Sequence, residues 1–494
     1  MKRIFKELPI HSFLIGLYVI MFIFAHNMNK TTFSSTYRSI GIEFIVSVIL
    51  FAISYLILRS GRKAGIFSTL VLVGFFTYGI FYNYLEDLYY QGYWPFSHIH
   101  RFLMGLYVLL YGFLLIVLYR SQRPHYNFNY VLNVFVLAIF ALNIPIAFIS
   151  FREKNTGNQQ SIPFLAINNS GYKSIGAIDT SYPDVYYIIL DGYAQKNSLQ
   201  EFYSDANPVL YNYLGERGFY IADSSRANYP FTVSSLSSSL NMEYLDAIDL
   251  TKTPPELIRD NTVNYVFKKA GYRIVNIESG YAVTEGLSSV DKTIKTGALN
   301  EFENRLLQLT ILRLDDVLGF SNYIRLKSEL DQLKDVMNEK GPKFSFIHLV
   351  CPHPPYVVDS SGKRTIRSSV TDMAWEPRKD YWNQLQYLSK NLMHFIDQVL
   401  SNSKRPPIII VQSDHGPWIK DTSAENVYNA RTRILNAYYV PDEIKKDLYR
   451  GITPVNSFRV IFSHLLKADF PLVPDHPFPF SKLSNDISFK KYNQ

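Results

Sequence analysis

The stretch PPIIIVQSDHGPW, residues 406–418, joins an apolar run to two residue types that bind metals. Residues 408–411 are continuously apolar, which is typical of a strand buried on both faces of a parallel sheet. Neighbouring side chains of a strand point to opposite faces, so Asp414 and His415 can face one ion only where the strand ends. The Gly-Pro pair that follows ends it there. The stretch therefore predicts a buried strand that leads into a candidate metal site.

Three further apolar runs have the same character, and helical patterns lie between them. The runs are VYYIIL (185–190), YRIVNI (272–277) and FSFIHLV (344–350). Segments 304–340 and 380–401 have helical character, the second because its apolar residues recur at spacings of three and four. The alternation of strands and helices predicts an α/β domain with a mainly parallel sheet.

The first 150 residues have a different composition, with five long apolar stretches. They cover roughly 9–26, 41–58, 65–83, 102–119 and 130–150. Each approaches the ~20 residues that a helix needs to cross a bilayer, so we expect five transmembrane helices. An apolar soluble bundle is the alternative, but segments such as GLYVLLYGFLLIVLY have no polar face for water. A cleaved signal peptide is disfavoured because four similar stretches follow the first, without a small-residue cleavage site.

Basic residues between these stretches predict the orientation. Eight lie at the N-terminus and in alternate loops: Lys2, Arg3, Lys6, Arg59, Arg62, Lys63, Arg120 and Arg123. The opposite loops hold only Lys30, Arg38 and Arg101. The N-terminus is therefore expected in the cytoplasm, and five crossings place everything after residue 150 on the other side.

The net charge of +8 belongs mainly to the membrane part of the chain. Residues 1–150 hold 11 Lys and Arg against 4 Asp and Glu, which leaves 39 against 38 for the rest. This distribution reflects membrane topology, and we expect no nucleic-acid partner.

We expect three parts: a transmembrane domain over 1–150, a linker over 151–180 and an exported domain over 181–494. The linker is predicted because its residues are polar, include Gly and Ser, and show no apolar periodicity. Cys351 is the only cysteine, so the exported domain forms no internal disulfide and depends on its core for stability.

Two more strands end in candidate ligands, at the edge where open α/β sheets bind their substrates. Asp191 directly follows the first strand, although Asp-Gly is also an ordinary turn. His353 follows the third strand within Pro-His-Pro-Pro, and His348 inside that strand is interpreted as a hydrogen-bonded core residue. Two carboxylates and an imidazole suit Zn²⁺ or Mn²⁺.

A further ligand or a nucleophile is expected in the hydroxyl-rich segment SRANYPFTVSSLSSSLNM, residues 225–242. A helix pattern begins just after Thr232, which places this hydroxyl near a helix N-terminus. An alkoxide there gains from the helix dipole, and more if a cation binds it. A loop or a simple helix cap is the alternative for this segment.

The motifs LDGY, NYPFT, HPPY and SDHG, in this order on an α/β sheet, resemble the alkaline phosphatase superfamily over roughly residues 183–465. Helices followed by such a domain are also the layout of phosphoethanolamine transferases and lipoteichoic acid synthases within it. The resemblance implies that Asp191, Thr232, Asp414 and His415 bind one divalent metal. It also implies that Thr232 is the nucleophile and that His353 contacts the substrate phosphate or the leaving group.

Departures from the subfamilies narrow this expectation. Nothing around Thr232 has the C/S-x-P-x-R form of sulfatases, so hydrolysis of sulfate esters is disfavoured. The Asp-x-x-x-His of two-metal phosphatases is absent from the sequence, which favours one metal. Lipoteichoic acid synthases generally have Glu where Asp191 stands, and phosphoethanolamine transferases usually have disulfides, so neither subfamily fits completely.

Three more residues are candidates for substrate binding. Trp418 is suited to pack over a small head group, with packing at the rim as the alternative. Arg431 and Arg433 are suited to bidentate phosphate contacts, with a solvated charged turn as the alternative.

Together with the predicted spans, the resemblance implies a bacterial, multi-pass membrane transferase with a periplasmic or extracellular catalytic domain. It would move a phosphoryl head group, phosphoglycerol or phosphoethanolamine, from a phospholipid donor to a glycan or lipid of the cell envelope. The alternatives are a phosphoester or sulfate-ester hydrolase of the same fold and a non-catalytic membrane scaffold.

Overall fold

The computed structural model divides the chain into two compact units, Met1–Thr156 with Asn300–Asp316, and Gly157–Leu299 with Val317–Gln494. The predicted exported domain includes residues 300–316, whereas they cluster with the N-terminal helices. The structure describes residues 2–27, 31, 33–96, 98–156, 182–203, 208–248, 252–313, 320–365, 375, 377–419 and 423–478. Helix α6 continues through residues 151–156, and the rest of the predicted linker lies outside the described residues.

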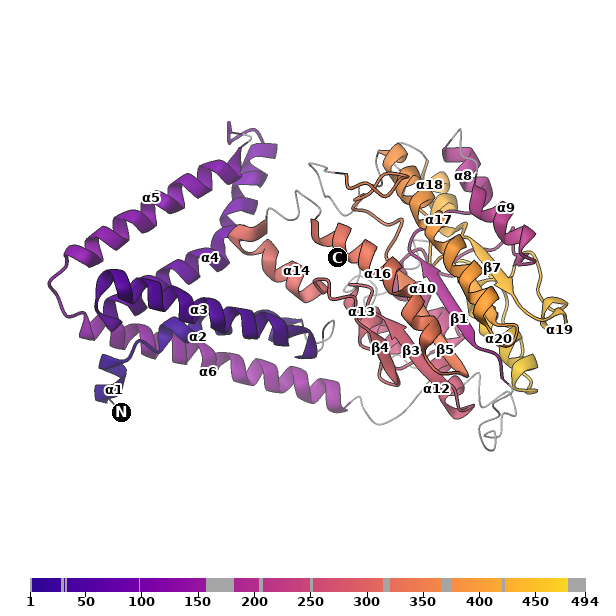
Figure 1. Ribbon diagram of the computed structural model, residues 1–494, viewed down its shortest axis with the longest axis horizontal. Coiled ribbons are helices and arrows are strands. Elements are labelled where there is room, and N and C mark those ends of the chain that lie inside the picture. The colour runs from indigo at the N-terminus through magenta and orange to yellow at the C-terminus, as the bar shows by residue number, and fades with distance from the viewer. Residues whose placement is uncertain are drawn as a thin grey trace. The chain divides into compact units, whose positions relative to one another are not determined.

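The first unit is helical (Figure 1). Its elements are α1 (Lys2–Glu7), α2 (His11–His26), η1 (Phe33–Thr36), α3 (Tyr37–Leu58), α4 (Gly61–Tyr90), α5 (Ile99–Arg120), α6 (Tyr126–Thr156), α14 (Glu301–Gln308) and η2 (Ile311–Arg313). Four helices in the described part of the chain have the length and apolar composition of membrane spans: Phe33–Leu58, Gly61–Tyr89, Ile99–Arg120 and Tyr126–Asn143. Helix α2 has 16 residues, about 24 Å at 1.5 Å per residue, and is shorter than the ~30 Å hydrocarbon core. The predicted number of five spans is therefore not confirmed.

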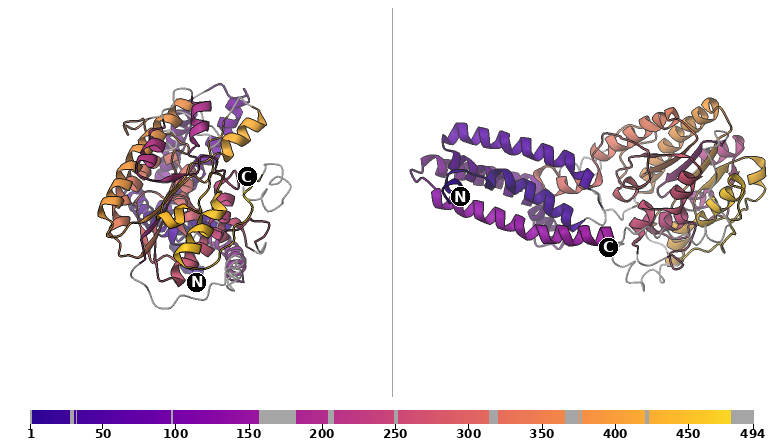
Figure 2. Two further views of the ribbon diagram at one scale, coloured as in Figure 1. Left: turned by 90° about the vertical axis from the view of Figure 1, so that its right-hand side faces the viewer. Right: turned by 90° about the horizontal axis from the view of Figure 1, so that it is seen from below.

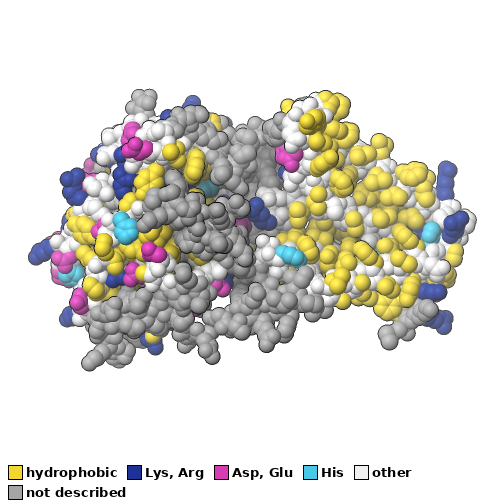
Figure 3. Space-filling model, turned by 180° about the vertical axis from the view of Figure 1, so that it is seen from behind, with side chains coloured by type: hydrophobic (Ala, Val, Ile, Leu, Met, Phe, Trp, Pro, Cys, Tyr) yellow, Lys and Arg dark blue, Asp and Glu magenta, His cyan; other side chains and the backbone are white. Residues whose placement is uncertain are grey.

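The outer surface of this helical unit is strongly apolar (Figure 3). Helices α3 and α5 expose long runs of large apolar side chains, among them Ile42, Phe44, Ile45, Ile49, Ile53, Leu106, Val108, Leu109, Phe113 and Ile116. A soluble monomer rarely exposes so much continuous apolar surface. The unit therefore has the exterior of a membrane-embedded bundle, in which α2–α6 run side by side (Figure 2).

The second unit is an α/β domain around a seven-stranded sheet with the order β2-β7-β6-β1-β5-β3-β4. The strands are β1 (Val185–Leu190), β2 (Tyr220–Ile221), β3 (Arg273–Ile277), β4 (Lys292–Ile294), β5 (Lys343–Leu349), β6 (Ile408–Gln412) and β7 (Asn436–Tyr439). The five strands from β6 to β4 are parallel, and β7 runs antiparallel to β6. The predicted mainly parallel α/β sheet is therefore confirmed, and all four predicted runs form central strands.

Helices cover both faces of this sheet. They are α8 (Lys196–Phe202), α9 (Val209–Glu216), α10 (Thr232–Asn241), α11 (Pro254–Arg259), α12 (Thr262–Lys269), α13 (Ala282–Glu285), α16 (Phe320–Asn338), α17 (Arg378–Asn402), α18 (Ala424–Thr432), α19 (Asp442–Lys445) and α20 (Pro454–Leu465). Along β1, Tyr186 and Ile188 pack with α9, α16 and α17, whereas Val185 and Tyr187 pack with α10, α12 and α20. Burial on both faces explains why these strands are continuously apolar.

Segment 304–340, predicted to be helical as a whole, is divided in the structure. Helix α14 ends at Gln308, η2 follows at Ile311–Arg313, and α16 covers Phe320–Asn338. The first part belongs to the helical unit and α16 covers the sheet. Because parallel strands share one direction, the carboxyl ends of β6, β1 and β5 meet at one edge, and this edge positions the candidate site.

Candidate functional site at the carboxyl edge of the sheet

Two neighbouring strands bring the predicted carboxylates together. Strand β1 ends at Leu190 and Asp191 follows, while β6 ends at Gln412, two residues before Asp414. The Gly192 amide donates to Asp414 Oδ1 at 3.1 Å, which ties the two strand ends to each other. Gly192 turns the chain with a φ of +77°. Both carboxylates are buried, and Asp191 Oδ1 and Asp414 Oδ2 have no hydrogen-bond partner.

Strand β5, on the other side of β1, adds His348. The sheet register pairs His348 with Ile189, close to the end of β1. Its Nδ1 is 3.1 Å from Thr284 Oγ1, whereas its Nε2 makes no hydrogen bond and lies 3.7 Å from Asp191 Oδ2. Only one ring nitrogen of this buried histidine is therefore satisfied, unlike the core residue that the sequence suggested. Among the described residues, Asp191, His348 and Asp414 hold ligand atoms within 4.8 Å of one another.

Thr232 and His415 complete the cluster. Thr232 is the first residue of α10, and its Oγ1 lies 3.0 Å from His415 Nε2. The same Nε2 is 3.6 Å from Asp191 Oδ1 and 3.4 Å from Asp414 Oδ2. His415 Nδ1 donates to the Gly416 carbonyl at 3.0 Å, so in the neutral ring the lone pair is on Nε2 and faces the cluster. The four residues expected to hold a metal thus lie together.

The serine-rich character of α10 has a packing reason. Ser235 donates to the Asp414 carbonyl at 2.7 Å and so fastens the helix to the end of β6. Ser234 and Ser237 donate to carbonyls of the preceding turn. These hydroxyls are satisfied within the fold, whereas the Thr232 hydroxyl points to the histidine of the cluster.

The electrostatics of the cluster favour a bound cation. Burial and the charge of Asp191 raise the pKa of Asp414. Burial also opposes ionisation of Asp191, but the neighbouring His353 and His348 hold its pKa below the usual range. Burial and the neighbouring Arg431 lower the pKa of His415, so its ring is neutral and suited to coordination. Unbonded buried carboxylate oxygens beside a neutral imidazole fit a divalent cation such as Zn²⁺ or Mn²⁺.

His353 lies in the loop after β5, close to this cluster. Its backbone amide donates to the Asp191 carbonyl at 3.1 Å, and its Nδ1 donates to the Pro354 carbonyl at 2.7 Å. The loop therefore holds His353 beside the cluster, with one ring nitrogen already bonded to the backbone.

The two candidate arginines have different surroundings. Arg431 is buried and donates to Pro230 O at 2.7 Å, to Gly416 O at 2.8 Å and to His415 Nε2 at 3.0 Å. Burial lowers its pKa to about 10, which still leaves it charged at neutral pH. Arg433 is directed to Glu201, with an ion pair of 2.7 Å. Only Arg431 thus contacts the cluster in the described part of the chain.

Aromatic rings surround this arginine. Its guanidinium carbon lies 5.9 Å from the Trp418 ring, 5.9 Å from Phe231 and 5.5 Å from Trp375. Trp375 is buried and lies 4.8 Å from the His353 ring and 6.3 Å from the His415 ring. A Cβ on Gly192 would approach Trp375 to 2.3 Å, so the glycine is needed for the ring to fit. Sequence reasoning missed Trp375, whose only signal was a tryptophan in a polar segment.

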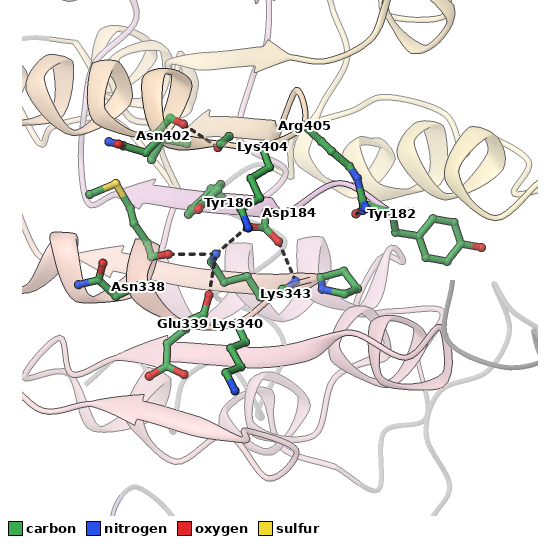
Figure 4. A pocket seen from close by; sticks show the side chains of 15 residues that line it. Tyr182, Asp184, Tyr186, Asn338, Glu339, Lys340, Lys343, Asn402, Lys404 and Arg405 are labelled. Atoms are coloured by element: carbon green, nitrogen blue, oxygen red, sulfur yellow. Dashed lines mark hydrogen bonds and ion pairs between the residues drawn. The ribbon is translucent and has the colours of Figure 1, made fainter. Parts of the chain in front are cut away.

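A pocket of about 580 Å³ lies elsewhere, at the amino ends of β1 and β5 (Figure 4). There Lys343 Nζ donates to Asp184 Oδ2 at 2.6 Å, to Glu339 O at 3.1 Å and to Met337 O at 3.4 Å. The buried ammonium is therefore fully satisfied. The pocket has volume but lacks the unbonded groups of the carboxyl edge, and we assign the chemistry to the latter.

The family of the chain follows from comparison with known proteins. A family model described as Sulfatase matches residues 183–463, more than half of the 494 residues. The chain belongs to the sulfatase family, and the resemblance to the alkaline phosphatase superfamily is confirmed. It is accordingly a sulfatase-like phosphotransferase or hydrolase.

Several solved structures are similar to the chain at low identity. The C-terminal periplasmic domain of EcEptC from Escherichia coli is 15% identical, with 61% of this chain and 86% of that chain covered and a TM-score of 0.42. Lipooligosaccharide phosphoethanolamine transferase A from Neisseria meningitidis is 14% identical, with 94% and 95% covered and a TM-score of 0.41. Phosphonate monoester hydrolase of Agrobacterium radiobacter is 11% identical, with 57% and 74% covered and a TM-score of 0.40. The comparison with curated proteins finds no match.

Proposed function

We propose that this chain is a metal-dependent transferase that moves a phospholipid-derived phosphoryl head group through a covalent intermediate on Thr232. The observation that carries the proposal is the position of Thr232 Oγ1, at the N-terminus of α10 and 3.0 Å from His415 Nε2. Two buried carboxylates with unbonded oxygens, Asp191 and Asp414, lie beside that histidine. A hydroxyl in these surroundings is suited to become a nucleophile.

Asp191, Asp414, His415 and Thr232 would hold one divalent cation, Mn²⁺ or Zn²⁺, with His348 as a further nearby donor. When bound, the cation lowers the pKa of a coordinated hydroxyl and neutralises charge on phosphoryl oxygens. The N-terminus of α10 adds its dipole at the same atom. Arg431 carries a positive charge that can stabilise the phosphoryl oxygens in the transition state.

The first half-reaction forms a phosphothreonine. Thr232 Oγ, which has lost its proton to water and reacts as the alkoxide, attacks the phosphorus of a phospholipid phosphodiester, and the bond from phosphorus to the glycerol oxygen of diacylglycerol breaks. His353, beside the cluster, donates a proton to that leaving oxygen. The phosphoryl group keeps its ethanolamine or glycerol substituent and remains esterified to Thr232.

The second half-reaction transfers the group and restores the enzyme. A hydroxyl of a cell-envelope glycan or lipid attacks the phosphorus, and His353 now accepts the proton of that hydroxyl. The bond from phosphorus to Thr232 Oγ breaks. Anchoring by apolar helices supports a lipid donor, because an enzyme confined to the bilayer meets lipid at a high effective concentration.

The decisive experiment is peptide mass spectrometry of Thr232 in protein purified from membranes, with Asp414→Ala as the control. We expect a metal-dependent adduct whose mass equals phosphoethanolamine or phosphoglycerol. An unmodified Thr232 with donor lipid and Mn²⁺ or Zn²⁺ supplied, together with undiminished transfer by Thr232→Ala, contradicts the proposal.

The proposed location is a bacterial cell membrane, with the N-terminus in the cytoplasm and the catalytic domain on the other side. This topology requires α2 to cross as a fifth span. A thiol reagent that cannot pass the membrane should label Lys404→Cys in intact spheroplasts and Leu8→Cys only after permeabilisation. Both positions are exposed, while the native Cys351 is buried. Labelling of both positions in intact spheroplasts contradicts five crossings.

A further inference from the structure

Residues 300–313 lie between β4 and α16 in the sequence, yet they belong to the helical unit. We call them the docking arm. Phe302 and Leu306, four residues apart on α14, share one face of that helix. They are 5% and 9% exposed and belong to one apolar cluster with residues of the N-terminal helices. The other buried members of this cluster are Ile15, Ile20, Phe24, Leu72, Phe76 and Val136.

A shared carboxylate fixes the start of the arm. Glu303 accepts from the Asn300 amide at 2.9 Å in the capping box of α14. It also accepts two hydrogen bonds from Arg38 of the helical unit, one of them at 2.6 Å from Nε. Asn300 Nδ2 donates to the Ser35 carbonyl at 3.0 Å. A two-pronged Arg–carboxylate contact is directional as well as strong, so the arm has a defined orientation.

The end of the arm contacts the backbone of Gly79 in α4. The Gly79 amide donates to the Leu309 carbonyl at 2.9 Å, and a Cβ at this position would lie 2.1 Å from Gln308 O. The two backbones thus touch where only a glycine fits. Arg313 then donates to Asn83 Oδ1 at 2.7 Å and to Gly79 O at 3.2 Å, and its guanidinium lies 3.9 Å from the Tyr82 ring.

Four independent features therefore hold the arm: an apolar insertion, a bidentate ion pair, a glycine-dependent backbone contact and a cation–π contact. Both ends of the arm continue into the α/β unit through the chain. We propose that the arm is an intramolecular coupling element that ties the catalytic unit to the membrane-embedded helices. This inference rests on the proposed function, because its predicted consequence is efficient use of a donor that lies in the bilayer.

The coupling predicts that loss of the arm lowers the turnover of a lipid substrate much more than that of a water-soluble substrate. A lipid donor in vesicles must be reached from the membrane, so loss of the arm should lower its turnover by ~10-fold or more through a lower effective concentration. A water-soluble chromogenic phosphodiester needs no membrane access, and its turnover should change less than about twofold. A residue with a merely structural role would lower both activities together.

The first test is Gly79→Ala, with Gly105→Ala as the matched control. Both glycines lie in long apolar helices, but nothing lies within 4 Å of a Cβ at Gly105. Alanine favours a helix in both cases, so only the contact with the arm separates the variants. We expect Gly79→Ala alone to lose lipid turnover while its metal content and soluble turnover stay normal. Equal lipid turnover in the two variants overturns the coupling.

The second test does not depend on folding of the glycine variant. Arg38→Glu leaves the capping box of α14 intact but places two carboxylates against each other, and Glu303→Arg restores opposite charges in the double variant. We expect Arg38→Glu to lower lipid turnover and the double variant to exceed the Glu303→Arg single variant, which shares its loss of the capping box, because the remaining loss belongs to the pair. A double variant no better than the Glu303→Arg single variant contradicts a specific pair.

A third measurement separates the docking from the proposed function. The variant Arg38→Cys with Glu303→Cys should form a cross-link with a short bifunctional thiol reagent in native membranes, and each single variant should not. This readout needs no activity. No cross-link overturns the docking even if the enzyme is active, whereas a cross-link in a protein without turnover of either substrate keeps the docking and rejects the proposed function.

Discussion

The two ends of the central strands both carry buried charged side chains, but these charges are balanced at the amino end only. At the amino end, Lys343 pairs with Asp184 at 2.6 Å and uses its remaining donors on two carbonyls. At the carboxyl end, Asp191 and Asp414 lie close together without a cation of the chain between them, and each has an unbonded oxygen. Lys343 is as buried as Asp191 and Asp414, so burial alone does not mark a functional site.

The difference lies in charge balance. A buried charge with a matched partner needs no further ligand, and the fold loses stability when that partner is removed. Two buried carboxylates side by side destabilise each other until a cation joins them. The carboxyl end therefore destabilises the metal-free protein, and the same unpaired carboxylates give it an affinity for a divalent cation that the amino end lacks. If the two ends differ in this way, substitutions at one end should have effects that the same substitutions at the other end lack.

The largest expected effect is on activity at the carboxyl end. Thr232→Ala and Asp414→Ala should each lower turnover by ~10³-fold or more, because the first removes the nucleophile and the second a metal ligand. Steady-state assays with matched protein concentration and metal supply check this. Lys343→Met, at the amino end, serves as control and should keep the turnover per folded molecule. A comparable loss in Lys343→Met would remove the contrast.

A smaller effect is expected from the arginines near the site. Arg431→Met should lower turnover by ~10²-fold, since a charged donor beside the phosphoryl position is lost. Arg433→Met should change it less than about threefold, because that side chain pairs with Glu201 in a partly exposed position. The measurement is kcat and KM for both variants with one donor. If the order of the two effects were reversed, the assignment of Arg431 to the site would be wrong.

Metal binding should stabilise the folded protein, and this gain should depend on residues of the carboxyl end only. At a free Mn²⁺ or Zn²⁺ concentration of 100 Kd, wild-type protein should gain about 2.7 kcal/mol over the chelated form. Asp184→Asn should show the same gain, and Asp414→Ala should show nearly none. Thermal unfolding in detergent, followed with and without chelator, gives the comparison. A gain that survives in Asp414→Ala places the metal elsewhere.

The smallest expected effect is on the free energy of unfolding, but its sign is informative. An Asp→Asn substitution should change this free energy in opposite directions at the two ends. Asp184→Asn should destabilise the metal-free protein by about 1–3 kcal/mol, because it leaves the buried Lys343 without its charged partner. Asp414→Asn should stabilise the metal-free protein by about 1 kcal/mol, because a repulsive charge is replaced by an amide donor facing Asp191. Denaturant titrations of chelated protein decide the signs, and equal signs would refute the charge-balance interpretation.

Local sequence determined a large part of this protein. The apolar runs that became β1, β5 and β6 were recognisable because strands buried on both faces need continuous apolar residues over a few positions. The turn residues after them indicated where each strand ends. Asp191, Asp414 and His415 could therefore be placed at one edge of the sheet without coordinates. Thr232 was predicted near a helix N-terminus from the pattern that follows it, and it is the first residue of α10.

Other features depended on which segments meet. The sequence suggested a core role for His348, whereas the register of β5 against β1 turns one ring nitrogen toward Asp191. Two positions separate Arg431 from Arg433, and only packing around α18 directs the first to His415 and the second to Glu201. Trp375 lies in a segment without periodicity, and its place beside His353 follows from tertiary contacts alone.

The docking arm shows the same limit at a larger scale. Its residues read as the start of a long helix covering the sheet, because helical spacing reports which face of a helix is apolar but not which partner buries it. Phe302 and Leu306 pack with residues more than 150 positions away in the sequence, and Gly79 matters only because the Leu309 backbone reaches it. Short-range patterns thus determined the strands, their ends and the chemistry placed there. Tertiary structure alone decided the partners, because a contact between distant segments leaves no spacing in either of them.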